Sequence, residues 1–165
     1  MLPRKRRAAL TVTALIAAAT AAVGTVPAAQ AAPATPTCQA AGLSLSVGQE
    51  QGAAGSILVP VNFTNTSTHT CALRGFPGVS VLDVNHHQIG SPASRDGSPV
   101  TTVAVRPGRT VSATIRTNDA GTGLACQRTS DYLGIYPPAG FQQMLIPYRL
   151  QVCGVFETGP VQAAG

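Results

Sequence analysis

The sequence has no tryptophan, and aromatic residues make up only 4% of its 165 residues. The buried Trp that marks antibody domains is therefore missing, so any likeness to immunoglobulin domains is one of architecture. A helical period of 3.6 residues is also missing from the body of the chain, and we expect no helix there. These absences argue against a helical or mixed fold.

Motifs for catalysis and for metal binding are scarce. No G-x-S-x-G elbow is present, and the nearest sequence, Gly78-Val79-Ser80-Val81, lacks the second glycine and lies in an expected strand. No C-x-x-C pair is present, which argues against structural zinc. The adjacent histidines His86 and His87 are the best metal-like cluster, but without a third ligand they fit a solvated polar turn better. We therefore predict no catalytic residue, no metal site and no cofactor.

The first 31 residues have the three parts of a secretory signal peptide. Residues 4–7 are all basic, residues 8–23 are apolar, and Ala29-Gln30-Ala31 is a small-x-small cleavage site. The apolar run is shorter than the roughly 20 residues needed to span a bilayer. We predict export by either the general or the twin-arginine route, cleavage after Ala31, and no membrane insertion afterwards.

After cleavage, an Ala/Pro/Thr linker at residues 32–37 would precede a single domain at residues 38–165. Four of the 11 Lys and Arg residues lie in the leader, so seven arginines remain against six acidic residues, a net charge of +1. These arginines are scattered from Arg74 to Arg149, whereas a nucleic-acid footprint needs a basic patch or stripe. We expect a protein released outside the cell, with no nucleic-acid partner.

Apolar residues alternate along much of the mature chain. The alternating sets are Leu43/Leu45/Val47, Ile57/Val59/Val61/Phe63, Val79/Val81, Val103/Val105, Val111/Ala113/Ile115 and Leu133/Ile135. Such runs, separated by Gly, Pro, Asn and Ser clusters, are typical of half-buried antiparallel strands. The predicted fold class is all-β, an immunoglobulin-like antiparallel β-sandwich of about seven to nine strands. Pro60 cannot donate to a strand ladder, so we expect its strand to be at an edge or bulged there.

The residues between these runs fit turns. Arg106-Pro107-Gly108-Arg109 has Pro and Gly in the two central positions of a type II turn. Asn62, Asn65 and Ser67 suit a turn held by side-chain bonds to the backbone. Asn62 and Asn65 also match the N-glycosylation pattern, but in a bacterial product they are more simply turn residues.

The cysteines are even in number: Cys38, Cys71, Cys126 and Cys153. In an exported chain this predicts two disulfides, for which three connectivities exist. We favour Cys38–Cys71 and Cys126–Cys153, because pairing between sequence neighbours has the smallest closure cost. Each bridge would then stabilise the domain by roughly 3–4 kcal/mol.

Several blocks carry a family resemblance. TCALRGFPGVS at residues 70–80, with the shorter blocks at residues 92–96, 106–108, 136–138 and 152–154, resembles the secreted actinobacterial family catalogued as "domain of unknown function 4232". The resemblance runs from about Cys38 to Val161. It implies a secreted, disulfide-containing β-sandwich. It implies no activity, so no catalytic residue is carried over.

One segment is a candidate binding loop, formed by Arg74, Gly75, Phe76, Pro77 and Gly78. It combines a guanidinium with an aromatic ring, and both residue types are enriched in interface hot spots. The alternative is that Phe76 plugs one end of the sandwich while Arg74 pairs with Asp83 or Asp96. We expect a substantially buried Phe76 beside an exposed Arg74.

The expected function is that of a non-catalytic extracellular module for an unidentified extracellular or cell-envelope ligand. A small secreted hydrolase with a loop-assembled site and an inhibitor presenting the Arg74–Gly78 loop are the alternatives. An enzyme should have a concave pocket with convergent titratable groups. A binding module should expose an apolar patch or aromatic rim, and an inhibitor a protruding rigid loop.

Overall fold

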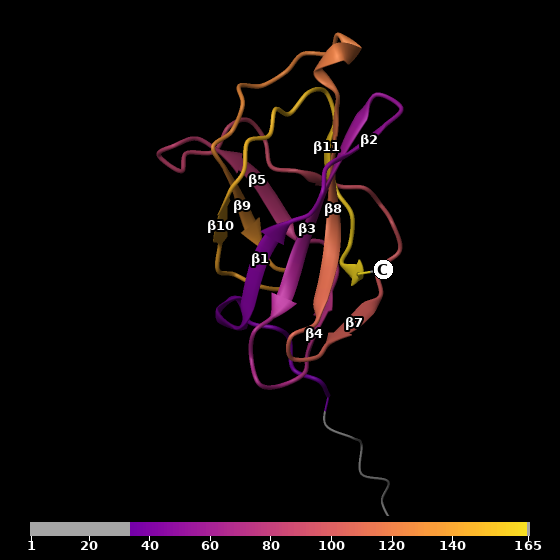
Figure 1. Ribbon diagram of the computed structural model, residues 1–165, viewed down its shortest axis with the longest axis vertical. Coiled ribbons are helices and arrows are strands. Elements are labelled where there is room, and N and C mark those ends of the chain that lie inside the picture. The colour runs from indigo at the N-terminus through magenta and orange to yellow at the C-terminus, as the bar shows by residue number, and fades with distance from the viewer. Residues whose placement is uncertain (1–33, 165) are drawn as a thin grey trace, which may run out of the picture. The chain divides into compact units, whose positions relative to one another are not determined.

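Residues 34–164 are described by the computed structural model, and nearly all regular structure in them is β-strand (Figure 1). The predicted leader, residues 1–31, lies outside the described residues. Only two short 3-10 helices interrupt the strands of this region, η1 (Ala40–Gly42) and η2 (Ala120–Thr122). No helix between residues 34 and 164 is long and apolar enough to cross a membrane. The predicted all-β class is confirmed.

The largest sheet has seven strands. Its continuous order is β1 (Leu43–Val47), β3 (Ser56–Asn65), β8 (Thr110–Asn118), β11 (Phe156–Thr158) and β6 (Ser94–Arg95). In addition, β2 (Gln51–Ala53) pairs with β3 and β12 (Gln162–Ala163) pairs with β8. All these pairs are antiparallel except β6 with β11, which is parallel and departs from the wholly antiparallel expectation.

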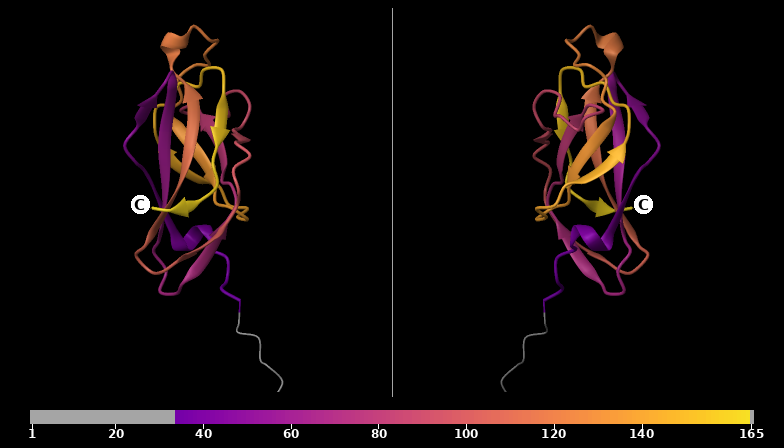
Figure 2. Two further views of the ribbon diagram at one scale, coloured as in Figure 1. Left: turned by 90° about the vertical axis from the view of Figure 1, so that its right-hand side faces the viewer. Right: turned by 90° about the vertical axis from the view of Figure 1, so that its left-hand side faces the viewer.

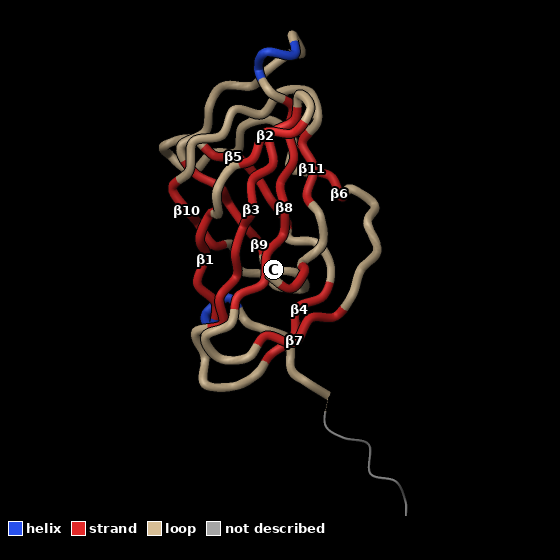
Figure 3. Tube along the Cα trace, turned by 45° about the vertical axis from the view of Figure 1, so that its right-hand side comes forward, coloured by secondary structure: helices blue, strands red, loops and turns tan. Residues whose placement is uncertain are grey.

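Two smaller sheets complete the fold. One has the order β10 (Met144–Pro147), β9 (Tyr132–Tyr136) and β5 (Gly78–Leu82). The other pairs β4 (Cys71–Arg74) with β7 (Thr102–Val105). The side views of Figure 2 show these strands as a second layer beside β1, β3 and β8, and the tube in Figure 3 shows that loops join the layers at both ends. The described chain is therefore a β-sandwich, with twelve strand segments because several strands are short or interrupted.

The hydrophobic core lies between the layers. Most residues of the predicted period-two runs are buried in it: Leu43, Val59, Val61, Phe63, Val79, Val81, Val105, Val111, Ala113, Ile115, Leu133 and Ile135. Four others of these runs, Leu45, Val47, Ile57 and Val103, are only partly buried, and Leu73, Leu150, Val152 and Val161 are core residues outside the runs. The buried residues of the runs point inward because alternate residues of a strand face opposite sides of a sheet. Burial of this apolar surface is the main force that holds the layers together.

The strand that contains Pro60 is central, so the predicted edge position is wrong. β3 pairs with β8 along its whole length, and its other side is covered by β1 and then by β2. The interruption lies in the neighbouring strands, because β1 ends at Val47 and β2 begins at Gln51. Gly48 donates to the Pro60 carbonyl at 2.8 Å. The Pro60 N–H that is missing would face the Gly48 carbonyl just past the end of β1, so only one bond of that pair is lost.

The disulfides join Cys38 to Cys71 and Cys126 to Cys153, as the sequence-local pairing predicted. The first one ties the start of the domain to β4. The end of the predicted linker runs beside the same strand, since Ala72 donates to the Pro36 carbonyl at 2.8 Å and Cys38 donates to the Ala72 carbonyl at 3.0 Å. The described chain has no free cysteine.

The two asparagines of the predicted turn have different positions. Asn65 is the last residue of β3, is fully buried, and accepts from the backbone N–H and the hydroxyl of Ser67 at 2.9 and 2.7 Å. This is the side-chain turn that the sequence predicted. Asn62 lies within β3, opposite Ser46 and Ser112, and is not a turn residue.

The outer edge of β10 is unpaired. β9 forms ladder bonds to β10 through Leu133 and Ile135, because its other residues face β5. The backbone N–H and C=O of Leu145 consequently point away from the sheet, and no other strand of residues 34–164 pairs with this edge. Pro147 ends the strand and contributes no N–H to the edge.

Candidate functional site

The hairpin made by β9 and β10 exposes apolar side chains to an unusual degree. Five large hydrophobic residues are exposed in the described chain, and three belong to this hairpin: Tyr136 (39% exposed), Phe141 (97%) and Leu145 (42%). Monomeric domains rarely expose large apolar patches, and such patches mark interaction sites. We use the name hairpin face for the outward-facing residues of this hairpin, which are Tyr132, Gly134, Tyr136, Phe141, Gln143 and Leu145.

Strand alternation explains why these residues face outward. Leu133 and Ile135 are buried in the core, so Tyr132, Gly134 and Tyr136 lie on the opposite side of β9. Leu145 is paired directly with Gly134 and shares that side. Gly134 has no Cβ, and the space that one would fill is occupied by the side-chain amide of Gln143. Gly134 is buried, with a methyl group of Leu82 also close to it, and Tyr132 and Tyr136 lie on either side of it along β9.

Polar groups on the hairpin face are available to a ligand. Within residues 34–164, the hydroxyls of Tyr132 and Tyr136 and the amide of Gln143 make no hydrogen bond to protein. Tyr148, outside this face, differs because its hydroxyl donates to Glu50 at 2.9 Å. Burial is the larger cause and this hydrogen bond the smaller one of a rise in the pKa of Tyr148 to about 12. The hairpin face thus offers aromatic surface with free donors and acceptors.

The tip of the hairpin borders a hollow. Phe141 and its neighbours Gly140 and Gln142 line a space of about 560 Å³ with Gln39, Ala40 and Ala41, from the first turn of the domain. The lining is uncharged and includes the exposed side chain of Phe141. The hairpin face thus continues into a concave, neutral surface.

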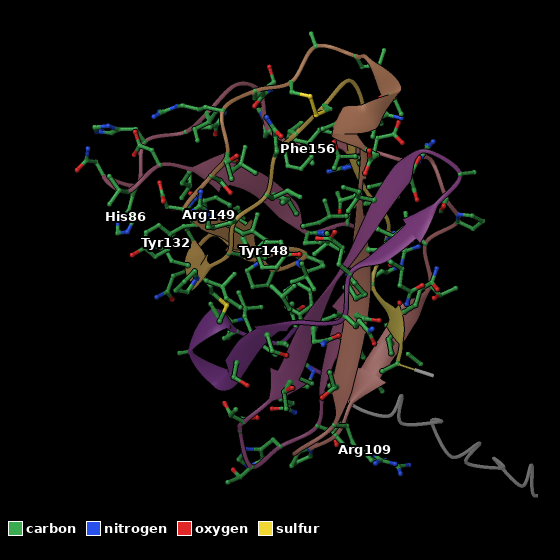
Figure 4. All side chains as sticks on the ribbon, turned by 45° about the horizontal axis from the view of Figure 1, so that its top comes forward. His86, Arg109, Tyr132, Tyr148, Arg149 and Phe156 are labelled. Atoms are coloured by element: carbon green, nitrogen blue, oxygen red, sulfur yellow. A yellow bond between two sulfur atoms is a disulfide. The ribbon has the colours of Figure 1, made fainter. Side chains whose placement is uncertain are left out.

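The histidine turn packs against the start of this face. His86 has a positive φ of 62°. Its ring meets the Tyr132 ring edge to face, with 4.7 Å between the ring centroids, and both residues are labelled in Figure 4. Asp83 shapes the turn by accepting the backbone N–H of His87 at 2.8 Å and the Arg128 guanidinium at 3.0 Å. The His87 N–H, with help from Arg128, holds the pKa of Asp83 below its ordinary value against the opposing effect of burial.

The predicted polar turn is therefore present and also orients an aromatic ring of the hairpin face. Both His86 and His87 are exposed. The described residues contain no group of three His, Cys, Asp or Glu side chains placed to hold a metal ion.

The predicted loop Arg74–Gly78 ends beside the hairpin face. Gly78 is paired with Tyr136, and a Cβ added to Gly78 would lie 3.3 Å from the Tyr136 Cβ. The loop is held at Gly75, which has a φ of 105° and whose carbonyl accepts from Val161 at 2.9 Å. Pro77 is buried.

Arg74 is exposed as expected, whereas Phe76 is only partly buried. Neither ion pair considered for Arg74 is present in the described chain: Asp83 pairs with Arg128, and Asp96 accepts from the Ser98 N–H. The guanidinium over the Phe76 ring belongs instead to Arg95, 5.6 Å from the ring centroid. This cation–π contact joins the loop to the segment of Asp96, through a different pair of residues than the sequence predicted.

The hairpin face was not predicted from the sequence, although the pattern for it is present. Tyr132, Gly134 and Tyr136 alternate with two core residues, and this pattern alone predicts that both tyrosines face outward. The exposure of Phe141 depends on the path of the loop between β9 and β10, and no local pattern specifies it.

The described chain is thus an all-β sandwich domain with two disulfides and an exposed aromatic hairpin. The protein belongs to the family described as "Domain of unknown function (DUF4232)", whose sequence model matches residues 38–162. The predicted family is therefore confirmed. No curated protein matches the chain.

Two solved structures are similar over part of their length. One is a selenomethionine-labelled β-glucosidase from Kluyveromyces marxianus, with a TM-score of 0.36 and 14% identity over 71% of this chain and 14% of that chain. The other is β-glucosidase from Kluyveromyces marxianus in complex with glucose, with a TM-score of 0.31 and 13% identity over 68% of this chain and 15% of that chain. This protein therefore spans about one seventh of the length of those enzymes.

Proposed function

We propose that this domain is a non-catalytic extracellular binding module that contacts its ligand through the hairpin face. The observation that carries the proposal is that one hairpin holds three of the five exposed large hydrophobic residues of the described chain. Aromatic side chains in such positions supply much of the energy of recognition, because they bury a large area with few rotatable bonds.

The lining of the described hollows also favours binding. The hollow beside Phe141 is lined by glutamine, alanine, glycine and phenylalanine. A second hollow is lined by arginine, threonine, glycine, valine and alanine. Groups that commonly act as general acids or bases, such as imidazoles and carboxylates, line neither of these two.

The extracellular location is part of the proposal. Disulfides persist in oxidising compartments outside the cytosol, and two are formed here. N-terminal sequencing of secreted protein should begin at Ala32, within a few residues. Recovery of the protein in the membrane fraction with residues 1–23 attached would contradict release.

Affinity capture tests the hairpin face directly. Immobilised protein should capture a ligand from the cell-wall or secreted fraction of the producing cell, and Tyr136→Ser with Leu145→Ser should reduce capture at least about tenfold. The matched control is Val84→Ser with Leu124→Ser, because these are the other two exposed large hydrophobic residues.

The control should capture as well as wild type. Equal capture by the hairpin variant and the control would show that binding takes place elsewhere. If the wild-type protein captured nothing from either fraction, the binding role itself would be wrong. Circular dichroism melts of both variants should match wild type, because surface substitutions change stability by about 0.5 kcal/mol or less.

A further inference from the structure

A second hollow, of about 620 Å³, opens where β7 and β8 separate. The two strands follow each other in sequence but enter different sheets, since β7 pairs with β4 and β8 pairs with β3 and β12. The space left between them is lined by Val103, Ala104, Arg106, Gly108, Arg109, Thr110, Val111, Ala163 and Ala164. Its volume is in the range of small-ligand sites.

The charged side chains that line this hollow in the described chain are both positive. Among the residues from 34 to 164, Arg106 and Arg109 are the only ionisable ones that line it, and both side chains are exposed. Neither forms an ion pair within residues 34–164, whereas Arg116 pairs with Glu157 and Arg128 pairs with Asp83. Two guanidinium groups therefore stand at one hollow with their charges uncompensated by a neighbouring carboxylate of the described chain.

The turn that carries the two arginines is fixed before any ligand arrives. Arg109 donates to the Arg106 carbonyl at 3.0 Å, and Gly108 has a φ of 72°, so this is the predicted type II turn. The backbone of Asn65 bonds to both Gly108 and Arg109, at 2.8 and 3.0 Å. Its side-chain amide donates to the Val105 carbonyl at 2.8 Å. A turn held at three points by a buried residue does not have to be ordered when a ligand binds.

We propose that this hollow is a binding site for a compact oxyanion, a carboxylate or phosphate carried on a small apolar group. Guanidinium groups bind both oxyanions through paired N–H bonds. The apolar part of the ligand would contact Val103, Ala104 and Ala163, whose short side chains leave the space open. The site is formed by β7, β8 and β12, so it is separate from the hairpin face and does not depend on the function proposed there.

NMR titration of the full domain at low salt tests the site with three probes. N-acetyl-alanyl-alanine carries a carboxylate, its C-terminal amide carries none, and inorganic phosphate carries the oxyanion without the apolar group. The carboxylate or phosphate should shift the backbone amides of Gly108 and Ala163, and the neutral amide should not. Added salt should weaken binding, because both arginines are exposed to solvent.

Variants separate site binding from general charge. Arg106→Gln with Arg109→Gln should weaken oxyanion binding at least about tenfold. Arg149→Gln should leave it unchanged, since Arg149 is exposed and lies away from Arg109 in Figure 4. Arg106→Lys with Arg109→Lys keeps the charge but loses the paired donors, and should fall between the two.

Three results would overturn the proposal. They are the absence of amide shifts with both oxyanions, shifts that map away from the hollow, and equal weakening by Arg149→Gln and by the double glutamine variant. A carboxylate-only response would identify a peptide or acid terminus as the source, and a phosphate-only response a phosphorylated group. Unchanged melting temperatures of all variants would show that lost binding is not lost folding.

Discussion

Replacement of Asn65 by alanine should destabilise the domain far more than its place next to a loop suggests. The Asn65 side chain makes four hydrogen bonds: it donates to the carbonyls of His69 and Val105, each at 2.8 Å, and accepts twice from Ser67. Both Asn65 and Val105 are 0% exposed. The alanine variant would leave the Val105 carbonyl buried without this donor, and water cannot replace it.

The magnitude follows from these contacts. The Val105 carbonyl is also paired with Cys71 in the β4–β7 ladder, so it loses one of two donors, and such a lost hydrogen bond costs about 0.5–1.5 kcal/mol. The His69 carbonyl keeps a bond from the Ser67 hydroxyl at 3.0 Å, so its loss is smaller. With the released turn and the small cavity, we expect a total of about 2–4 kcal/mol of unfolding free energy. A urea slope of about 2 kcal/mol per molar, in the middle of the usual range, predicts a midpoint lower by roughly 1–2 M.

Asn62→Ala is the matched control for a urea titration followed by circular dichroism. Asn62 is in the same strand and is the same residue type, but its side chain is half-buried and makes one hydrogen bond, to Ser46 at 3.4 Å. We expect the control to lose less than about 0.5 kcal/mol. If Asn65→Ala unfolds at the same urea concentration as Asn62→Ala, the reasoning about the buried carbonyl is wrong.

Three further predictions concern the disulfide, the binding loop and pH. Replacement of Cys126 and Cys153 by alanine should remove roughly 3–4 kcal/mol, because that bridge closes a loop of 27 residues; a melt within a degree of wild type would contradict this. Phe76→Ala should cost about 1–3 kcal/mol, less than a fully buried ring, and a larger loss would mean that the ring is a core plug. Asp83 has a lowered pKa in the folded state, so its contribution to stability is present above its ordinary pKa of 3.8 and is lost as pH falls through the lower folded value. Asp83→Asn should therefore flatten the acid side of a plot of melting temperature against pH. An unchanged slope would refute the assignment.

The core could be predicted from the sequence because burial follows a period of two. Leu133 and Ile135 lie on the same face of β9, and a shift in register by one residue would expose both, so the alternation alone predicts that they face the core. The local disulfides were also predictable from spacing. The position of Pro60 was not, because its tolerance depends on where two neighbouring strands stop. Local sequence carries no information about that gap.

The candidate sites show the same limit. The outward orientation of Tyr136 is encoded by alternation, but its place beside Gly78 depends on the pairing of β5 with β9. The stacking of Arg95 on Phe76 joins segments whose contact is set by the fold as a whole. The residue types of a binding surface can thus be suggested from sequence, whereas their assembly depends on strand pairing between distant segments.

The unpaired edge of β10 has a consequence for behaviour at high concentration. An exposed strand edge is a template on which identical chains can add to one another and grow into fibres. Here the edge offers few backbone groups besides the N–H and C=O of Leu145, because β10 spans only residues 144–147 and Pro147 supplies no N–H. A second chain added to this edge would gain few bonds and could not continue past the proline. The domain can therefore display an apolar hairpin and still resist polymerisation through that edge.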